Sequence, residues 1–255
     1  MNSSGRRAGK LEGLWRSSRG FPVLLLALQP IAPYAWTESF IQGRLDPSRW
    51  QTTAEGDFRE GTVDVVDVGK PGASDFRLRL RADTRGTRDD TVKFLGVGTT
   101  FRIPLGGPTR ISLRLDWNEQ ANGSYLSAGL VLSPENTTGN PLQRRNWLKV
   151  EYVGVPPGKN ARLVVSLKRE GRERSLHTEG WPETNRAGRK LAVQNIEIVT
   201  VGGSFEVWEN GALQYEAPEE TLPFDSAYLY LQMSSHSNYP PREIFFDEIR
   251  VVEGH

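Results

Sequence analysis

The residues of this chain that could bind a ligand are aromatic and polar side chains spaced two residues apart. In the segment WLKVEY, Trp147, Lys149 and Glu151 occupy alternate positions, and apolar residues lie between them. Successive side chains of an extended strand point to opposite faces, so these three share one polar face. An indole ring can stack on a sugar ring while a carboxylate and an ammonium group bind its hydroxyl groups. The pattern favours a glycan-binding surface.

Two later segments repeat this arrangement. Residues 205–209 (FEVWE) place Trp208 on a polar face beside Glu206, and residues 227–232 (AYLYLQ) do the same for Tyr228 and Tyr230. We expect the aromatic rings of the three segments to gather on one sheet face. The alternative is that the rings fill the space between the sheet and a covering loop.

Two polar, turn-rich segments add loop candidates. Residues 177–185 (HTEGWPETN) contain Trp181, and residues 234–241 (SSHSNYPP) contain His236 and Tyr239. Loops on a rigid scaffold often carry binding residues. An aromatic ring in a loop can instead cover a sheet edge. His236 has no catalytic partner that the sequence identifies, so a surface histidine is its alternative.

The composition excludes several kinds of chemistry. The 255 residues include no cysteine and only three histidines, so thiolate catalysis, disulfides and cysteine-based metal sites are excluded. The sequence also lacks a Gly-x-Ser-x-Gly elbow, a His-Glu-x-x-His motif and a phosphate-binding loop ending in Gly-Lys-Ser/Thr. The sequence signatures of these enzyme classes are therefore absent.

The first 35 residues have the order of an export signal. Five basic residues precede an apolar run over residues 21–28, and small residues follow near residue 35. The run is shorter than the roughly 20 residues that span a bilayer. We expect a signal peptide or N-terminal export segment over residues 1–35, and a secreted or periplasmic protein without a membrane span in its mature chain. An uncleaved anchor and a wrongly assigned start are the alternatives.

The charge of the remaining chain argues against nucleic acid and anionic membranes as partners. Without residues 1–35 the chain has 27 basic and 30 acidic side chains, a net charge of −3. Such a domain has no overall attraction for phosphate groups, so we expect neither nucleic acid nor an anionic membrane as its partner.

Strands must position the candidate residues, because the sequence after the export segment predicts strands and turns and no amphipathic helix. Period-two alternation recurs over residues 61–68, 76–82, 97–103, 111–117, 125–133, 147–153, 162–168, 196–201, 205–209, 227–232 and 243–252. Gly, Pro and Asn clusters separate these runs, and Asn210-Gly211 predicts a β-hairpin with a type I′ turn. We expect an all-β protein: two antiparallel sheets packed as a sandwich or jelly roll, in one domain over residues 36–255.

Both ends of this domain resemble concanavalin A-like lectin/glucanase sandwiches, a superfamily that includes laminin-G-like domains and family-sixteen glycoside hydrolases. The resemblance rests on an opening strand at residues 36–50 (WTESFIQGRLDPSRW) and a closing strand at residues 244–252 (IFFDEIRVV). The Asn210-Gly211 hairpin fits the region before the closing strand. The resemblance implies a concanavalin A-like jelly roll whose concave face binds or cleaves glycans.

The catalytic branch of this superfamily carries Glu-x-Asp-x-x-Glu on one strand, and this chain lacks that motif. Asp64 and Asp67, like Asp116 and Glu119, have odd spacing, which sends their carboxylates to opposite faces of a regular strand. The sequence therefore predicts a carbohydrate-binding domain without catalytic activity. A glycoside hydrolase or lyase with differently placed carboxylates and a structural domain that docks another protein are the alternatives.

The resemblance also implies a structural calcium ion. In related sandwiches the closing-strand aspartate, here Asp247, helps to hold a cation, and Glu38 lies near the corresponding place of the opening strand. Ser39 stands where the family often has an acidic residue. Oxygen ligands of this kind suit Ca²⁺. The alternative is that Asp247 caps a turn or pairs with an arginine.

Five arginines lie at alternating positions of two predicted strands. Arg77, Arg79 and Arg81 belong to one strand, and Arg110 and Arg114 belong to another. They could form a stripe for an acidic polysaccharide. We favour the alternative that they line a solvated sheet face and pair with neighbouring carboxylates.

Overall fold

The computed structural model describes residues 35–88, 91–116, 126–154, 161–180, 193–217, 221–235 and 238–254. All of them belong to one compact unit, Pro33–His255. Residues 1–34 of the predicted export segment, and the candidates Trp181 and His236, lie outside the described residues. Within the described ranges, no helix is long and apolar enough to cross a membrane.

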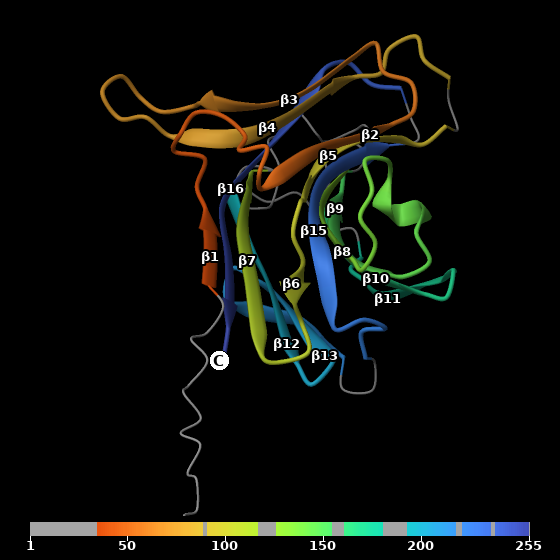
Figure 1. Ribbon diagram of the computed structural model, residues 1–255. Coiled ribbons are helices and arrows are strands. Elements are labelled where there is room, and N and C mark those ends of the chain that lie inside the picture. The colour runs from red at the N-terminus through yellow and green to blue at the C-terminus, as the bar shows by residue number, and fades with distance from the viewer. Residues whose placement is uncertain are drawn as a thin grey trace, which may run out of the picture. The chain divides into compact units, whose positions relative to one another are not determined.

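The strands form two antiparallel sheets, which pack face to face (Figure 1). Sheet A has the order β14-β13-β12-β7-β16-β4-β3, with β1 paired to β16; sheet B has the order β11-β10-β9-β8-β15-β5-β2, with β6 paired to β15. The strands of sheet A are β1 (Ala35–Glu38), β3 (Glu60–Asp67), β4 (Phe76–Asp83), β7 (Thr109–Asp116), β12 (Val193–Val201), β13 (Ser204–Glu209), β14 (Ala212–Ala217) and β16 (Arg242–Glu253). Those of sheet B are β2 (Trp50–Glu55), β5 (Lys93–Thr99), β6 (Ile103–Pro104), β8 (Ser127–Ser133), β9 (Trp147–Val153), β10 (Arg162–Arg169), β11 (Arg172–Thr178) and β15 (Ser226–Ser235). The predicted all-β, two-sheet antiparallel architecture is confirmed.

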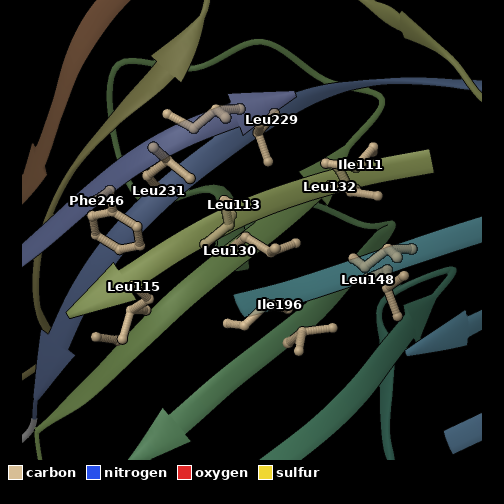
Figure 2. Close-up of a cluster of buried hydrophobic side chains, with 14 of the residues drawn as sticks. Ile111, Leu113, Leu115, Leu130, Leu132, Leu148, Ile196, Leu229, Leu231 and Phe246 are labelled. Atoms are coloured by element: carbon tan, nitrogen blue, oxygen red, sulfur yellow. The ribbon is translucent and has the colours of Figure 1, made fainter. Parts of the chain in front are cut away.

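The apolar positions of the alternating strands form the core between the sheets. Figure 2 shows Leu113 and Phe246 of sheet A meeting Leu130, Leu148 and Leu231 of sheet B. All five side chains are at most 2% exposed. Burying each such side chain contributes about 2 kcal/mol. Because these residues point inward, the residues between them point to the outer faces of the two sheets.

Two hairpins turn on residues with positive φ angles. The predicted hairpin joins β13 to β14 through Asn210 (φ 51°) and Gly211 (φ 78°), as a type I′ turn requires. A second hairpin joins β10 to β11 through Glu170 (φ 51°) and Gly171 (φ 86°). Glutamate seldom adopts this conformation, so the second turn could not be predicted from its residue types.

Candidate functional site

The outer face of sheet B brings together the polar residues of β9 and β15. The strand register aligns Gln232 of β15 with Gly129 of β8, and Gly129 with Glu151 of β9. The neighbouring cross-strand row extends from Tyr230 to Lys149. Residues that face each other across antiparallel strands point to the same side of the sheet. Glu151, Lys149, Gln232 and Tyr230 therefore share one face, as the alternation predicted.

A hollow of about 470 Å³ opens on this face and lies within the range typical of ligand sites. We call it the polar hollow. Its polar lining includes Ser127, Asn140, Gln143, Lys149, Glu151 and Ser234, and its apolar lining includes Leu142 and Val153. The hollow thus combines charged, amide and hydroxyl groups with a small apolar surface, a combination that suits a hydroxyl-rich ligand.

Lys149 and Glu151 form an ion pair at the wall of the polar hollow. The Lys149 Nζ lies 2.8 Å from Glu151 Oε1, and the two side chains are only 12% and 7% exposed. An ammonium group has three donor hydrogens and a carboxylate has about four acceptor positions, so the pair leaves both groups with unused capacity. Each can bind a ligand hydroxyl group without breaking the pair.

The amide of Gln232 lies beside this pair without a hydrogen bond. It is fully buried, and within the described part of the chain neither its nitrogen nor its oxygen has a partner. Gly96 and Gly129 face it on the two neighbouring strands. A Cβ atom at Gly129 would lie 2.1 Å from the carbonyl oxygen of Val150, so the glycine is required there. An unpaired buried polar group costs about 1–3 kcal/mol, and Gln232 is not among the residues that line the polar hollow.

Residues 134–146, which we call the covering loop, pass over part of this face (Figure 1). The Trp147 Nε1 donates to the carbonyl oxygen of Leu142 at 3.0 Å, and the amide of Thr137 donates to the Tyr230 hydroxyl at 3.0 Å. Trp147 is 1% exposed and Tyr230 is fully buried. Both rings fill the space between sheet and loop, which is the packing alternative of the sequence analysis.

The buried Tyr230 hydroxyl makes a second hydrogen bond to the covering loop. Burial raises the pKa of this hydroxyl to about 12, so it keeps its proton at neutral pH. It donates that proton to the carbonyl oxygen of Glu135 at 3.0 Å. Tyr230 is thus a structural support of the covering loop.

The covering loop reaches the edge strand β2. The amide of Ala54 donates to the carbonyl oxygen of Thr138 at 3.1 Å, and the amide of Asn140 donates to Glu55 Oε2 at 3.2 Å. Asn140 also caps the short 3-10 turn Pro141–Gln143, since its side chain accepts from the amide of Leu142. The loop is fastened at both ends, and its Leu142 and Gln143 form part of the wall of the polar hollow.

The other aromatic candidates lie elsewhere. Tyr228 is half-buried on the outer face of sheet B, where the Arg102 guanidinium lies 5.5 Å from its ring centroid. Trp208 is on the outer face of sheet A, where its Nε1 donates to Glu206 Oε2 at 2.8 Å. The expectation that one face gathers all these rings was therefore wrong for Trp208. Tyr239 is 2% exposed and belongs to the core.

Glu38 and Asp247 do not fit a shared calcium site. Glu38 aligns with Ile249, which points into the core, and its Oε2 accepts from Trp50 Nε1 at 3.3 Å. Asp247 aligns with Arg114 on the outer face of sheet A, and their charged groups lie 3.6 Å apart. The two carboxylates thus point to opposite sides of the sheet. Among the described residues, no three His, Cys, Asp or Glu side chains are grouped so that they could hold a metal ion.

The arginines of β4 and β7 pair with carboxylates, as the favoured alternative predicted. Arg77 pairs with Asp75 and Asp116, Arg79 with Asp64 and Glu243, Arg81 with Glu60, Arg110 with Glu197, and Arg114 with Asp247 and Glu248. These ion pairs neutralise the outer face of sheet A. They leave little positive charge there for an acidic polysaccharide.

Comparisons with solved structures identify the fold. Over 87% of this chain and 98% of the other, the structure matches the β-glucanase of Bacillus licheniformis with a TM-score of 0.59 and 10% identity. The laminarinase catalytic domain of Thermotoga maritima matches over 86% and 97%, with a TM-score of 0.59 and 15% identity. The globular domain of T. cruzi calreticulin matches over 86% and 88%, with a TM-score of 0.56 and 14% identity. The chain has the concanavalin A-like β-sandwich fold.

No protein-family model and no curated protein matches the sequence. The resemblance of both chain ends to the concanavalin A-like sandwich nevertheless predicted the fold correctly. One detail differs: residues 36–50 are not a single opening strand. β1 ends at Glu38 in sheet A, a turn with Phe40 at φ 54° follows, and β2 begins at Trp50 in sheet B.

Proposed function

We propose that this domain binds a glycan in the polar hollow without cleaving it. The observation that carries the proposal is the Lys149–Glu151 ion pair in the wall of the polar hollow, next to the amide side chains of Asn140 and Gln143. Amide, carboxylate and ammonium groups fixed by a sheet can bind several hydroxyl groups of one sugar in a defined orientation. Named neighbours of the fold, a β-glucanase and a laminarinase, act on polysaccharides.

The spacing of the carboxylates favours binding over hydrolysis. Glycoside hydrolysis uses two carboxyl groups about 5 Å apart for retention or about 6.5–9.5 Å apart for inversion. Glu151 and Glu173 both line the polar hollow. Their partners on β10 are Val164 and Lys168, four residues apart. That separation is about 14 Å along the strand direction. Glu151 is also already paired with Lys149, which suits a binding role.

Export of the protein forms part of the proposal. The basic segment, apolar run and small residues over residues 1–35 support a secreted or periplasmic location, where polysaccharides are accessible. Amino-terminal sequencing of the protein recovered from the cell envelope or medium tests this step. A mature terminus near residue 36 is expected, and an intact Met1 on an exclusively intracellular protein would contradict it.

A glycan array with the purified chain, combined with an assay for new reducing ends on every hit, tests the binding function. Binding without new ends is expected. Glu151→Gln should weaken binding at least tenfold, because it removes a charge-assisted hydrogen bond. Trp208→Ala is the control, since Trp208 lies on the other sheet and should leave affinity unchanged. New reducing ends would show that the protein is a glycoside hydrolase. Absence of binding to every glycan on the array would reject the proposal.

A further inference from the structure

The hairpin of β10 and β11 carries a group of arginines unlike those of sheet A. Arg169 of β10 and Arg172 of β11 are direct cross-strand partners, and Arg174 lies two positions further along β11. Leu167 aligns with Arg174, so all four side chains share one face of the hairpin. Like charges placed directly opposite each other destabilise a sheet. Arg169 and Arg172 therefore form an unfavourable cross-strand pair at this edge of sheet B.

No ion pair offsets the charge of the opposed arginines. Within the described ranges, neither Arg169 nor Arg172 has a carboxylate oxygen within 4.0 Å, whereas each arginine of β4 and β7 has one. Arg169 instead donates to the carbonyl oxygen of Thr221, a neutral partner that holds the guanidinium in place. Arg169 is thus held in place, but among the described residues no carboxylate neutralises the charge of Arg169 or Arg172.

These arginines line a hollow of about 530 Å³, which we call the arginine hollow. Arg145, at the end of the covering loop, contributes a fourth guanidinium group, and the described residues of the lining include two carboxylates, Glu170 and Glu173. The amide of Gly171 donates to the carbonyl oxygen of Arg145 at 2.8 Å. The amide of Glu170 donates to Asn146 Oδ1, also at 2.8 Å. Loop and hairpin are therefore fastened together, and the positive groups converge on one place.

We propose that the arginine hollow binds the sulfate or uronate groups of an acidic polysaccharide. This inference rests on the proposed glycan-binding function and specifies the class of glycan. Guanidinium groups bind sulfate and carboxylate groups through two parallel hydrogen bonds, which gives geometric selectivity. Glu173 lines both the arginine hollow and the polar hollow. One polysaccharide chain can therefore place sugar hydroxyl groups in the polar hollow and an anionic substituent in the arginine hollow.

The charge distribution favours an acidic glycan over a nucleic acid. Nucleic-acid binding usually relies on an extended basic surface that follows a phosphate backbone. Here four guanidinium groups meet in one hollow, while the chain after residue 35 carries a net charge of −3. A ligand with separated anionic groups and neutral sugar hydroxyls between them matches this pattern better than a continuous phosphate chain.

Binding of the full chain to dextran sulfate, polygalacturonate, unmodified dextran and a 20-nucleotide single-stranded DNA tests the proposal. At least one acidic polysaccharide should bind at least tenfold more tightly than dextran and DNA. The double variant R169Q/R172Q should lose that advantage and most of the salt dependence. The matched control Arg79→Gln removes an arginine that is already paired with Asp64 and should change neither. Removing two opposed charges should not lower the melting temperature, so a folding defect would be recognised.

The outcomes separate this proposal from the proposed function. If the double variant binds every acidic polysaccharide like the parent chain, the arginine hollow is rejected as a binding site. Glycan binding in the polar hollow is then decided separately, by the glycan array and by the Glu151→Gln variant. If DNA binds as tightly as dextran sulfate and loses affinity equally in the double variant, the hollow is a general polyanion site and the glycan assignment is overturned.

Discussion

The indole nitrogen of Trp147 and the carbonyl oxygen of Leu142 lie 3.0 Å apart, and this hydrogen bond fastens the covering loop to sheet B. Lys168 Nζ donates to the same carbonyl oxygen at 3.0 Å. The ring of Trp147 also lies 5.5 Å from the ammonium group of Lys149, a distance that permits a cation–π interaction. One buried ring thus connects the loop, the ion pair and the wall of the polar hollow.

Trp147→Phe should loosen the covering loop while keeping an aromatic ring in the sheet. The variant removes the N–H donor and leaves a small void, so we expect a loss of about 2 kcal/mol in the free energy of unfolding. Hydrogen exchange at residues 134–146 should accelerate more than exchange in the core strands. Trp208→Phe is the control, since its indole bonds only to Glu206 on the other sheet. Unchanged exchange in the loop would show that other contacts hold it.

The Lys149–Glu151 pair should show strong energetic coupling. Lys149→Met alone leaves a carboxylate that is 7% exposed without its partner, and breaking such a pair typically costs about 3–5 kcal/mol. Adding Glu151→Leu should recover much of this loss, because two apolar side chains replace the pair. Urea unfolding of both single variants and the double variant measures the coupling. Additive losses would mean that solvent already screens the pair.

The alternation of the sequence predicted the central strands but missed both edges of sheet B. β9 and β15 have neighbours on both sides and one face towards the core, so the apolar residues of that face recur at every second position. β2 and β11 are the edge strands, and β11 (RERSLHT) has no fully buried residue. Edge strands are exposed along one side, so selection for apolar alternation is weaker there. The turn between β10 and β11 was also missed, because a glutamate at position 170 does not indicate a positive φ angle.

Prediction of the site was limited by tertiary structure. Alternation correctly placed Lys149 and Glu151 on one face, because that depends only on the geometry of a single strand. It could not assign Trp208 and Trp147 to different sheets, because the sheet that a strand joins is set by pairing with distant segments. The burial of Trp147 depends on contacts with a loop whose path follows from bonds such as that from Thr137 to Tyr230.

Asp247→Asn should stabilise the fold at neutral pH and should not alter any response to calcium. Burial raises the pKa of Asp247 above its usual value, so the ionised form is penalised in the folded state and the penalty grows as the pH rises through that pKa. Melting temperatures of parent and variant at pH 4 and pH 7, with calcium and with chelator, test this. A calcium-dependent stabilisation that the variant loses would instead restore the calcium site implied by the family resemblance.

Acid should weaken the fold through Asp83. Hydrogen bonds from the Arg85 guanidinium lower the pKa of Asp83 to about 2. The unfolded value is about 3.9. The folded state therefore binds this proton less readily, so the stabilisation is complete above about pH 4 and is lost as the pH falls towards 2. Asp83→Asn should flatten this part of the curve of unfolding free energy against pH. Arg85→Gln should raise the folded-state pKa of Asp83 towards the unfolded value and so make this loss smaller, and an unchanged curve in both variants would assign acid sensitivity to other carboxylates.

Gln232→Leu should stabilise the domain and leave its glycan affinity unchanged. The substitution replaces a fully buried amide without hydrogen bonds by an apolar side chain of similar size, so the free energy of unfolding should rise by about 1–2 kcal/mol. Glycan affinity should stay unchanged, because Gln232 does not line the polar hollow. Gln51→Leu is the matched control: its amide already donates to the carbonyl oxygen of Thr137 at 3.2 Å, so the fold should lose stability there. A Gln232→Leu variant that is less stable than the parent chain would show that the amide has a structural partner, such as an ordered water molecule.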